Sequence, residues 1–124
     1  MLAKNADPRL RVYVVWVPKL GAHESDVPVA TRFVSDPRAR HYWDSAGVLV
    51  KLYDPVLGLN EDAWDVYLLY GPEATWDGQA PPRPDFWMHQ LHLPARPGLS
   101  GSFLQPDAFA AKTDSLLRTP RHVP

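Results

Sequence analysis

The chain contains no cysteine among its 124 residues. Without a thiol, these residues can form no disulfide, no thiolate nucleophile and no thiolate metal site. A formal net charge of -1 gives no electrostatic reason to expect a nucleic-acid partner or an anionic membrane surface. No apolar run approaches the roughly 20 residues that span a bilayer, and no signal-peptide core follows Met1. We therefore expect a protein of the cytoplasm by default, with no membrane partner.

Length and composition predict one globular domain over residues 1–124, since 45% of the residues are hydrophobic and 22% are charged. Fourteen prolines are more than twice the usual share. The stretches 81–84 and 94–101 are therefore expected to be stiff connections. Pro120 should end the last helix and leave a flexible tail at 119–124.

Three strands are predicted. Residues 12–17 form an unbroken β-branched and aromatic run, VYVVWV, which is typical of a strand buried on both faces. Residues 63–70 form the second strand, and a long connection around Asp77-Gly78 leads to the third, residues 86–91. We expect the first two strands to be parallel and joined by a helical crossover, with the third antiparallel to the second.

Helix signals lie between and after these strands. Ser25 is expected to cap a helix that ends near Asp36-Pro37. Asp44 or Ser45 should cap a second helix, which Pro55 kinks or ends and Gly58 stops. The apolar side of that second helix is predicted to carry Val48, Leu49, Leu52 and Tyr53.

A last helix opens at Pro106-Asp107, so the predicted order is β-α-α-β-β-α. This order resembles the thioredoxin-like superfamily after its first strand and first helix. Residues 1–6 are similar to the last turn of that missing helix, and residues 12–18 to the strand that follows it. Residues 65–71 and 86–91 are similar to the antiparallel pair, and residues 107–117 to the closing helix.

Two departures from the family bear on function. The Cys-x-x-Cys pair is absent, so the resemblance implies no dithiol chemistry. The family also places a cis-proline before the strand at 64–70, where this chain has Glu61-Asp62-Ala63. The resemblance thus implies an α/β, thioredoxin-like fold that lacks the first strand, the Cys-x-x-Cys helix and the cis-proline.

The missing first strand would lie between the two parallel strands and would leave an unpaired edge on each. Such edges pair readily with another chain, so we expect a homodimer formed through exposed strand edges. Two alternatives stay open. The strands close up within one chain, or Met1 is an internal methionine of a longer reading frame that encodes the cysteines.

Polar candidates for chemistry are few. His41-x-x-Asp44 is expected at a helix start, with Asp44 as cap and His41 half exposed. His89 and His92 point to opposite faces of a strand and cannot share a metal ion. Carboxylates at 61, 62 and 65 lie just before the second strand. Carboxylates at such positions are more often exposed surface groups than catalytic ones. We predict no metal site and no cofactor, and no phosphate loop or nucleophile elbow occurs.

Aromatic residues are the other candidates, because Trp and Tyr bury much area at little entropic cost in interfaces and pockets. Trp87 and His89 share a strand face, and with Tyr67 or Leu69 they could line a shallow pocket. The full set of candidate binding residues is His41, Trp43, Trp64, Tyr67, Trp87 and His89. Core packing is the competing interpretation of the same aromatic residues.

The leading hypothesis is a non-catalytic thioredoxin-like domain that acts by self-assembly or binding. The first alternative is a small enzyme whose site uses histidines and carboxylates, drawn from His41, Asp44, Asp65 and His89. The second is a truncated thiol oxidoreductase without activity. The sequence does not name a ligand or a pathway.

Overall fold

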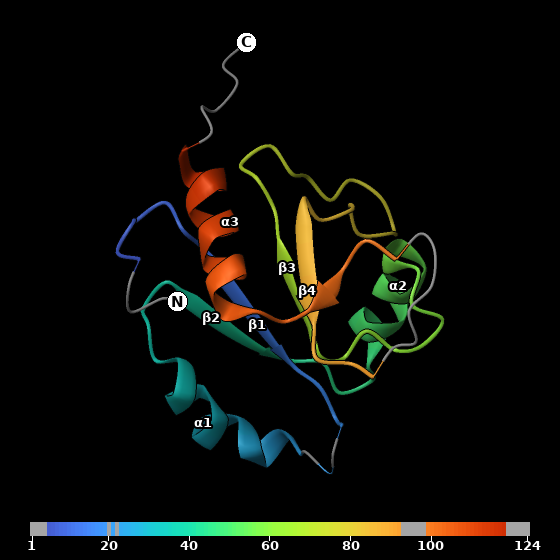
Figure 1. The fold of residues 1–124 in the computed structure, drawn as a ribbon. Coiled ribbons are helices and arrows are strands. Elements are labelled where there is room, and N and C mark those ends of the chain that lie inside the picture. The colour runs from blue at the N-terminus through green and yellow to red at the C-terminus, as the bar shows by residue number, and fades with distance from the viewer. Residues whose placement is uncertain (1–4, 20, 22, 93–98, 119–124) are drawn as a thin grey trace. The chain divides into compact units, whose positions relative to one another are not determined.

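The computed structural model describes residues 5–19, 21, 23–92 and 99–118. The chain has mixed α/β structure, with three α-helices and two small sheets among these residues. It divides into two compact units, Met1–Leu49 and Val50–Pro124, and each is described by itself (Figure 1). Within the described ranges, every helix is too short or too polar to cross a bilayer.

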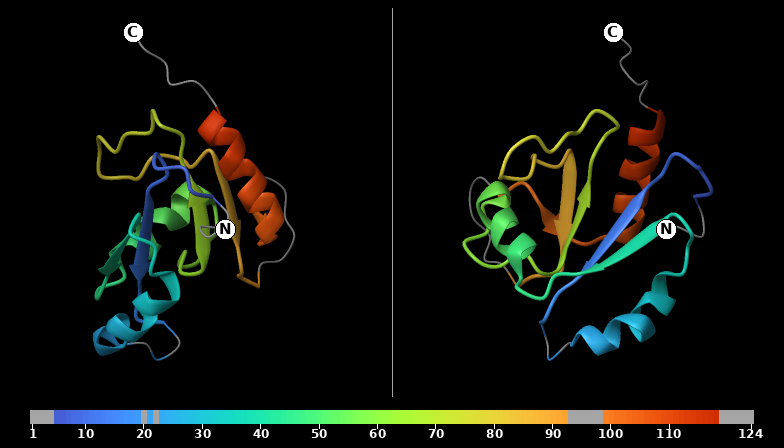
Figure 2. Two further views of the ribbon diagram at one scale, coloured as in Figure 1. Left: turned by 90° about the vertical axis from the view of Figure 1, so that its left-hand side faces the viewer. Right: turned by 180° about the vertical axis from the view of Figure 1, so that it is seen from behind.

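The first unit is built on two parallel strands, β1 (Val12–Trp16) and β2 (Ala39–Trp43). Their register places Val12 beside Ala39, Val14 beside His41 and Trp16 beside Trp43. Three short helical turns connect the strands: η2 (Glu24–Asp26), α1 (Val27–Ala30) and η3 (Thr31–Val34). The expected strand at the VYVVWV run is therefore confirmed, and its parallel partner is β2 (Figure 2). The expectation that this strand is buried on both faces is wrong, because Tyr13 is 65% exposed.

Strand β2 was not predicted, because its sequence was interpreted as the approach to a helix. The residues Ala39-Arg40-His41-Tyr42-Trp43 alternate in exposure, with Arg40 and Tyr42 exposed and the others half-buried. That alternation is the signature of a strand with one covered face. His41 accordingly lies in a strand and not at a helix start.

The helical segment between the strands covers most of the predicted span of 25–36 but starts differently. Ser25 lies inside the first turn, and the backbone N–H of His23 donates to Asp26 Oδ2 at 2.8 Å. The prediction that Ser25 is the cap is therefore wrong. Pro28 lies in the first turn of α1, where its missing N–H leaves no hydrogen bond unmade.

Helix α2 (Val48–Leu57) begins and ends at the predicted signals. The carboxylate of Asp44 accepts hydrogen bonds from the N–H groups of Val48 (3.0 Å) and Leu49 (2.8 Å). Gly58 adopts φ 71°, and the N–H groups of Gly58 and Leu59 both reach the carbonyl of Asp54.

The buried side of α2 differs from the prediction, and Pro55 does not end the helix. Val50 and Leu57 are the buried residues of α2, whereas Val48 is 52% exposed. Pro55 lies inside the helix, within its last turn. The helical pattern was therefore recognised, but the predicted buried side included the exposed Val48 and omitted Val50 and Leu57.

The second unit contains a three-stranded sheet of order β3-β4-β5 and the closing helix α3 (Pro106–Arg118). Strands β3 (Val66–Leu69) and β4 (Phe86–His89) are antiparallel, as predicted, and a long loop joins them. Strand β5 (Ser102–Phe103) was not predicted; it has two residues and lies parallel to β4. Figure 1 shows α3 beside this sheet.

The sheet of the second unit has apolar residues on both faces. One face joins a core cluster whose buried members are Leu57, Leu59, Ala63, Trp87 and Leu91. On the other face, Phe109 of α3 packs edge-on against Tyr67 and tilted against Phe86, each with ring centroids 6.3 Å apart. Cores of this kind on both faces explain why β4 has three of its four residues buried.

Some predictions concern residues outside the described ranges. These are the part of the 94–101 connection before residue 99, the tail at 119–124, and residues 1–4 of the proposed helical turn. Residues 5 and 6 of that turn are not helical.

Candidate functional site

The outer edge of β1 is the first candidate for a binding surface. The N–H of Val12 donates to the carbonyl of Arg38 (3.2 Å), and the carbonyl of Trp16 accepts from Asp44 (2.8 Å). Peptide groups alternate along a strand, so Tyr13 and Val15 direct their N–H and C=O groups away from β2. Among the described residues of the first unit, no backbone hydrogen bond reaches those groups. Within its own unit, strand β1 thus has one edge without a partner strand, and its five residues are uncharged.

Two tyrosines lie exposed on the sheet face next to this edge. Tyr13 of β1 is 65% exposed and Tyr42 of β2 is 50% exposed. Their rings stack across the strands with centroids 6.4 Å apart and planes 27° from parallel. Arg40, also exposed, is the register partner of Tyr13. Strand alternation could have revealed Tyr13 from sequence, but Tyr42 could be placed only once β2 was recognised.

His41 holds the other face of this sheet to the helical segment. Its Nδ1 accepts a hydrogen bond from the indole N–H of Trp16 at 3.0 Å. Because an indole nitrogen only donates, the proton of neutral His41 lies on Nε2, which donates to the carbonyl of Val34 at 2.9 Å. Both ring nitrogens are therefore occupied inside the first unit, which favours a structural role for His41.

A second open edge belongs to β3. The carbonyls of Asp65 and Leu69 accept from Gln90 (3.0 Å) and Asp85 (2.8 Å), so odd-numbered residues face β4. Val66 and Leu68 consequently direct their peptide groups away from β4, and no described strand of the second unit pairs with them. Their side chains pack against the core cluster, so this edge has an apolar inner side.

The register separates the aromatic residues that were expected to share a pocket. Val66 lies beside His89 and Leu68 beside Trp87, whereas Tyr67 lies beside Met88. Tyr67 and Leu69 are therefore on the opposite face from Trp87 and His89, because side chains alternate along a strand. The expectation that either residue joins that pair in a pocket is wrong.

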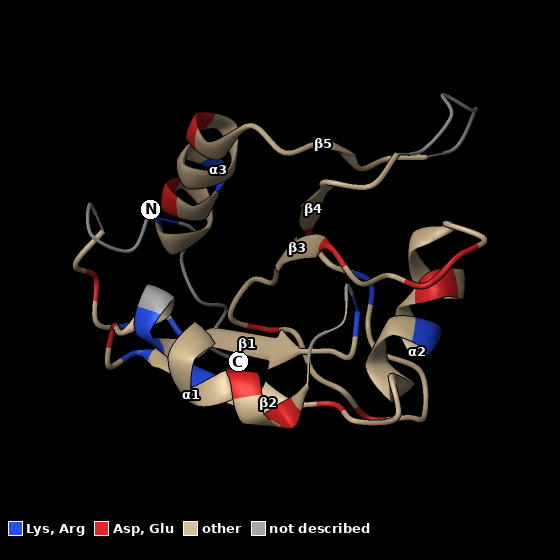
Figure 3. Ribbon diagram, turned by 90° about the horizontal axis from the view of Figure 1, so that it is seen from below, with Lys and Arg blue, Asp and Glu red and all other residues tan. Residues whose placement is uncertain are grey.

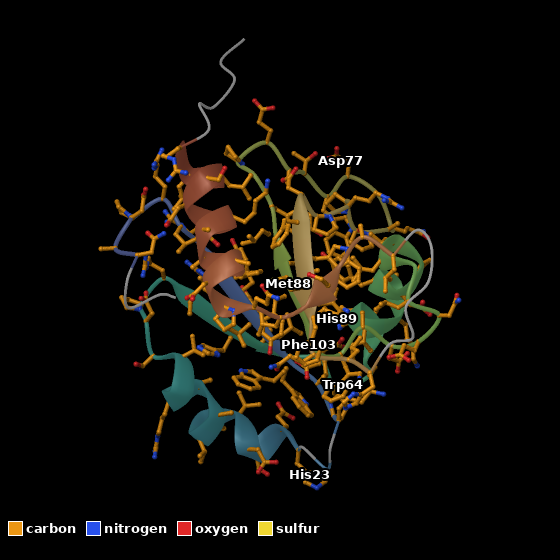
Figure 4. All side chains as sticks on the ribbon, viewed as in Figure 1. His23, Trp64, Asp77, Met88, His89 and Phe103 are labelled. Carbon is orange, nitrogen blue, oxygen red and sulfur yellow. The ribbon has the colours of Figure 1, made fainter. Side chains whose placement is uncertain are left out.

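Trp87 and His89 do lie together on one face of the sheet, as expected. Their ring centroids are 5.7 Å apart, and Phe103 of β5 lies edge-on to His89 at 6.0 Å (Figure 4). Both residues are only 5% exposed. His89 Nδ1 accepts from the backbone N–H of Leu91 at 3.1 Å. This environment is a packed interior and leaves Trp87 and His89 little exposed surface for a ligand.

Tyr67 belongs to a polar group at the start of the β3–β4 pair. Its hydroxyl lies within hydrogen-bond distance of Asp65 Oδ1 (3.1 Å) and Gln90 Oε1 (2.9 Å), and its single proton serves one of these acceptors at a time. Burial raises the pKa of Tyr67 to about 12, and the carboxylate of Asp65 adds to the shift. Tyr67 therefore stays protonated at neutral pH.

A second tyrosine pair was missed by the sequence analysis. The hydroxyls of Tyr53 in α2 and of Tyr70 lie 2.7 Å apart. The hydroxyl of Tyr70 donates to the carbonyl of Pro82 at 2.7 Å. Burial raises the pKa of Tyr70 further above its usual range, and the hydrogen bond with Tyr53 acts in the same direction. Trp76 packs edge-on against Tyr53. These contacts anchor the long loop between β3 and β4.

The remaining candidates have structural positions. Trp43 is half-buried beside Trp16 in β2, and Trp64 is partly buried against the core cluster. No group of three or more His, Cys, Asp or Glu side chains suited to a metal ion occurs within the described part of the chain. The six predicted site residues are thus divided between the two units and do not form one site in either of them.

Comparison of the chain with protein-family models, with curated proteins and with solved structures gives no match.

Proposed function

We propose that this chain is a non-catalytic α/β protein of the thioredoxin-like type that acts by self-association through its open strand edges. The observation that carries the proposal is the edge of β1, where the peptide groups of Tyr13 and Val15 have no partner strand within the first unit. Folded proteins usually protect such an edge with charge, proline, a bulge or a covering element. Strand β1, with the sequence VYVVW, has neither charge nor proline.

The element order supports the thioredoxin-like part of the proposal. The order is β1, a helical segment, the parallel strand β2, α2, the antiparallel pair β3–β4, and α3. This sequence of elements is similar to that of a whole thioredoxin-like domain once β2 is counted. On this interpretation β1 takes the place of the family's first strand, whereas the sequence resemblance led us to expect that this strand is missing.

The non-catalytic part rests on what the site residues already do. No cysteine is available for dithiol chemistry in these 124 residues. Both nitrogens of His41 hold neighbouring groups, and Asp44 is fully used in capping α2. His89 lies in a packed interior, and Asp65 accepts a hydrogen bond from Tyr67. Within each unit taken by itself, the residues of the enzyme alternative serve these structural contacts.

Sedimentation analysis of the purified chain between about 1 and 100 µM tests the proposal. We expect a reversible monomer–dimer equilibrium. Val15→Pro removes only an outward-facing N–H, and Tyr13→Lys adds a charge to the edge strand, so both changes should weaken the dimer.

Tyr42→Lys is the matched control, because Tyr42 is also exposed but lies on β2. It should weaken the dimer less than Tyr13→Lys. Circular dichroism must show that each variant folds. A chain that is monomeric over the whole range would contradict the proposal, and the β1 edge would then be covered within one molecule.

A further inference from the structure

His41 holds two neighbours through ring nitrogens that play opposite roles. Nδ1 accepts the indole N–H of Trp16 at 3.0 Å, and Nε2 donates to the carbonyl of Val34 at 2.9 Å. All three residues belong to the first unit, and both contacts are part-buried. Only a neutral imidazole makes both bonds, because an imidazolium carries a proton on each nitrogen and accepts nothing. The two contacts therefore respond differently to acid.

We infer that His41 is a pH-sensitive switch at the carboxyl end of β1. As the pH falls, a proton from solvent adds to the lone pair of Nδ1, and the indole N–H of Trp16 loses its acceptor. The Nε2–H bond to the Val34 carbonyl is retained and becomes charge-assisted, which strengthens it. Acid thus releases the indole but keeps the helical segment attached to β2. The inference is independent of the proposed self-association.

The backbone of the strand pair takes no part in the change. The carbonyl of Trp16 accepts from the N–H of Asp44 at 2.8 Å, and the β1–β2 register continues back to Val12 and Ala39. Backbone amide groups do not titrate, so these bonds remain when His41 is protonated. Release is therefore confined to the Trp16 side chain.

The pH range of the switch follows from the type of side chain. Imidazole is the side chain whose charge ordinarily changes between about pH 5 and 8. Hydrogen bonds from Arg38 lower the pKa of Asp36 to about 2, so this ion pair before β2 stays ionised over that range. A change of pH within the range therefore alters His41 without opening the neighbouring ion pair.

The charged residues of the surrounding elements leave His41 as the group that changes. Strand β1 has no charged residue, as Figure 3 shows. Arg32 is exposed in η3, and Arg40 is exposed on the opposite face of β2. Both arginines stay charged throughout. The carboxylate of Asp44, after β2, is directed to the first N–H groups of α2.

NMR spectroscopy of the full chain labelled with 15N tests the switch between about pH 8 and 5. At the basic end we expect the neutral tautomer of His41 with its proton on Nε2. Toward the acidic end, the Nδ1 signal should change to that of a protonated nitrogen, whereas Nε2 stays protonated. The indole N–H signal of Trp16 should move toward that of an unbonded indole, with the same midpoint. Circular dichroism should stay unchanged, because the strands remain paired.

Two variants separate His41 from the other groups that titrate. His41→Asn cannot titrate, and its side-chain oxygen can accept from Trp16 near the position of Nδ1. The indole signal should then be independent of pH. His23→Asn is the matched control, because His23 is exposed in the same unit. This variant should keep the wild-type response.

Several outcomes would overturn the inference. One is an indole signal that stays constant while His41 takes up its proton. Others are a neutral His41 with its proton on Nδ1, a His41 that stays neutral throughout the range, and a pH response that persists in His41→Asn. Loss of the circular dichroism signal in acid would show unfolding and not a local release. The wild-type spectrum reads His41 and Trp16 directly, so it decides the question even if His41→Asn fails to fold.

Discussion

The indole N–H of Trp16 donates to Nδ1 of His41 at 3.0 Å, and the two rings lie within 8° of parallel. The same imidazole donates from Nε2 to the carbonyl of Val34. One side chain therefore connects β1, β2 and the end of the helical segment. This connection explains how a sheet of only two parallel strands can be held to its crossover.

Replacement of His41 by phenylalanine should destabilise the chain. The ring keeps its size, but the Trp16 N–H and the Val34 carbonyl lose their partners. Because both groups are part-buried, we expect a loss of about 1–3 kcal/mol in the free energy of unfolding. Urea denaturation, monitored by tryptophan fluorescence, measures this free energy of unfolding. His92→Phe is the control, since His92 is exposed. Equal stability of the two variants would show that the bonds to His41 contribute little.

Gly101 should not tolerate a side chain. A Cβ built there would overlap ring atoms of Trp87, which is itself buried and donates to Ser100 Oγ. Relief of that overlap requires movement of the indole or of β5, at a cost of about 1–3 kcal/mol. Gly101→Ala should therefore lower the free energy of unfolding measured in urea. Gly78→Ala meets no atom within 4 Å and should be close to neutral. A stable Gly101→Ala variant would mean that β5 shifts without cost.

Sequence patterns predicted the elements whose signals are local. The VYVVWV run, the capping carboxylate at Asp44, the stop at Gly58 and the start at Pro106 all carry their information within a few residues. The antiparallel β3–β4 pair was also predicted, because two apolar runs flank a long polar loop. In these cases the local preference and the fold agree.

Strand β2 and the division of the site residues could not be predicted in the same way. The run Arg40-His41-Tyr42 has a strand pattern only because β1 pairs with it along one edge and the helical segment covers one of its faces. Strand β5 has two residues and depends on β4. Tyr67 was assigned to the face of Trp87 because the register of β3 against β4 is set by contacts distant in sequence.

Asp44 should be the residue that fixes the start of α2. Its two carboxylate oxygens accept from successive backbone N–H groups of the helix. Asp44→Ala leaves both donors without that acceptor and should cost about 1–2 kcal/mol of stability. Ser45→Ala is the control, because Ser45 is exposed and was the alternative cap. Denaturation of the two variants in parallel gives the difference. If Ser45→Ala loses more stability than Asp44→Ala, then Ser45 and not Asp44 caps α2.

The Asp36–Arg38 pair should make the first unit sensitive to acid. The guanidinium of Arg38 donates to both oxygens of Asp36, at 3.0 and 2.7 Å, and lowers the pKa of that carboxyl to about 2. A lowered pKa in the folded state stabilises it above the unfolded value of about 3.8. That contribution is lost as the pH falls through about 2. Arg38→Gln removes the main cause, so the pKa of Asp36 should rise toward 3.8.

The pH titration of the Asp36 carboxyl carbon by NMR measures this change directly. Arg9→Gln is the matched control, because Arg9 makes the same contact with Asp7 and lowers the pKa of that carboxyl instead. Each substitution should therefore move the titration of its own aspartate and leave the other nearly unchanged. If Arg38→Gln leaves Asp36 titrating near pH 2, the backbone N–H of Arg38, which also donates to Asp36, would be the dominant cause.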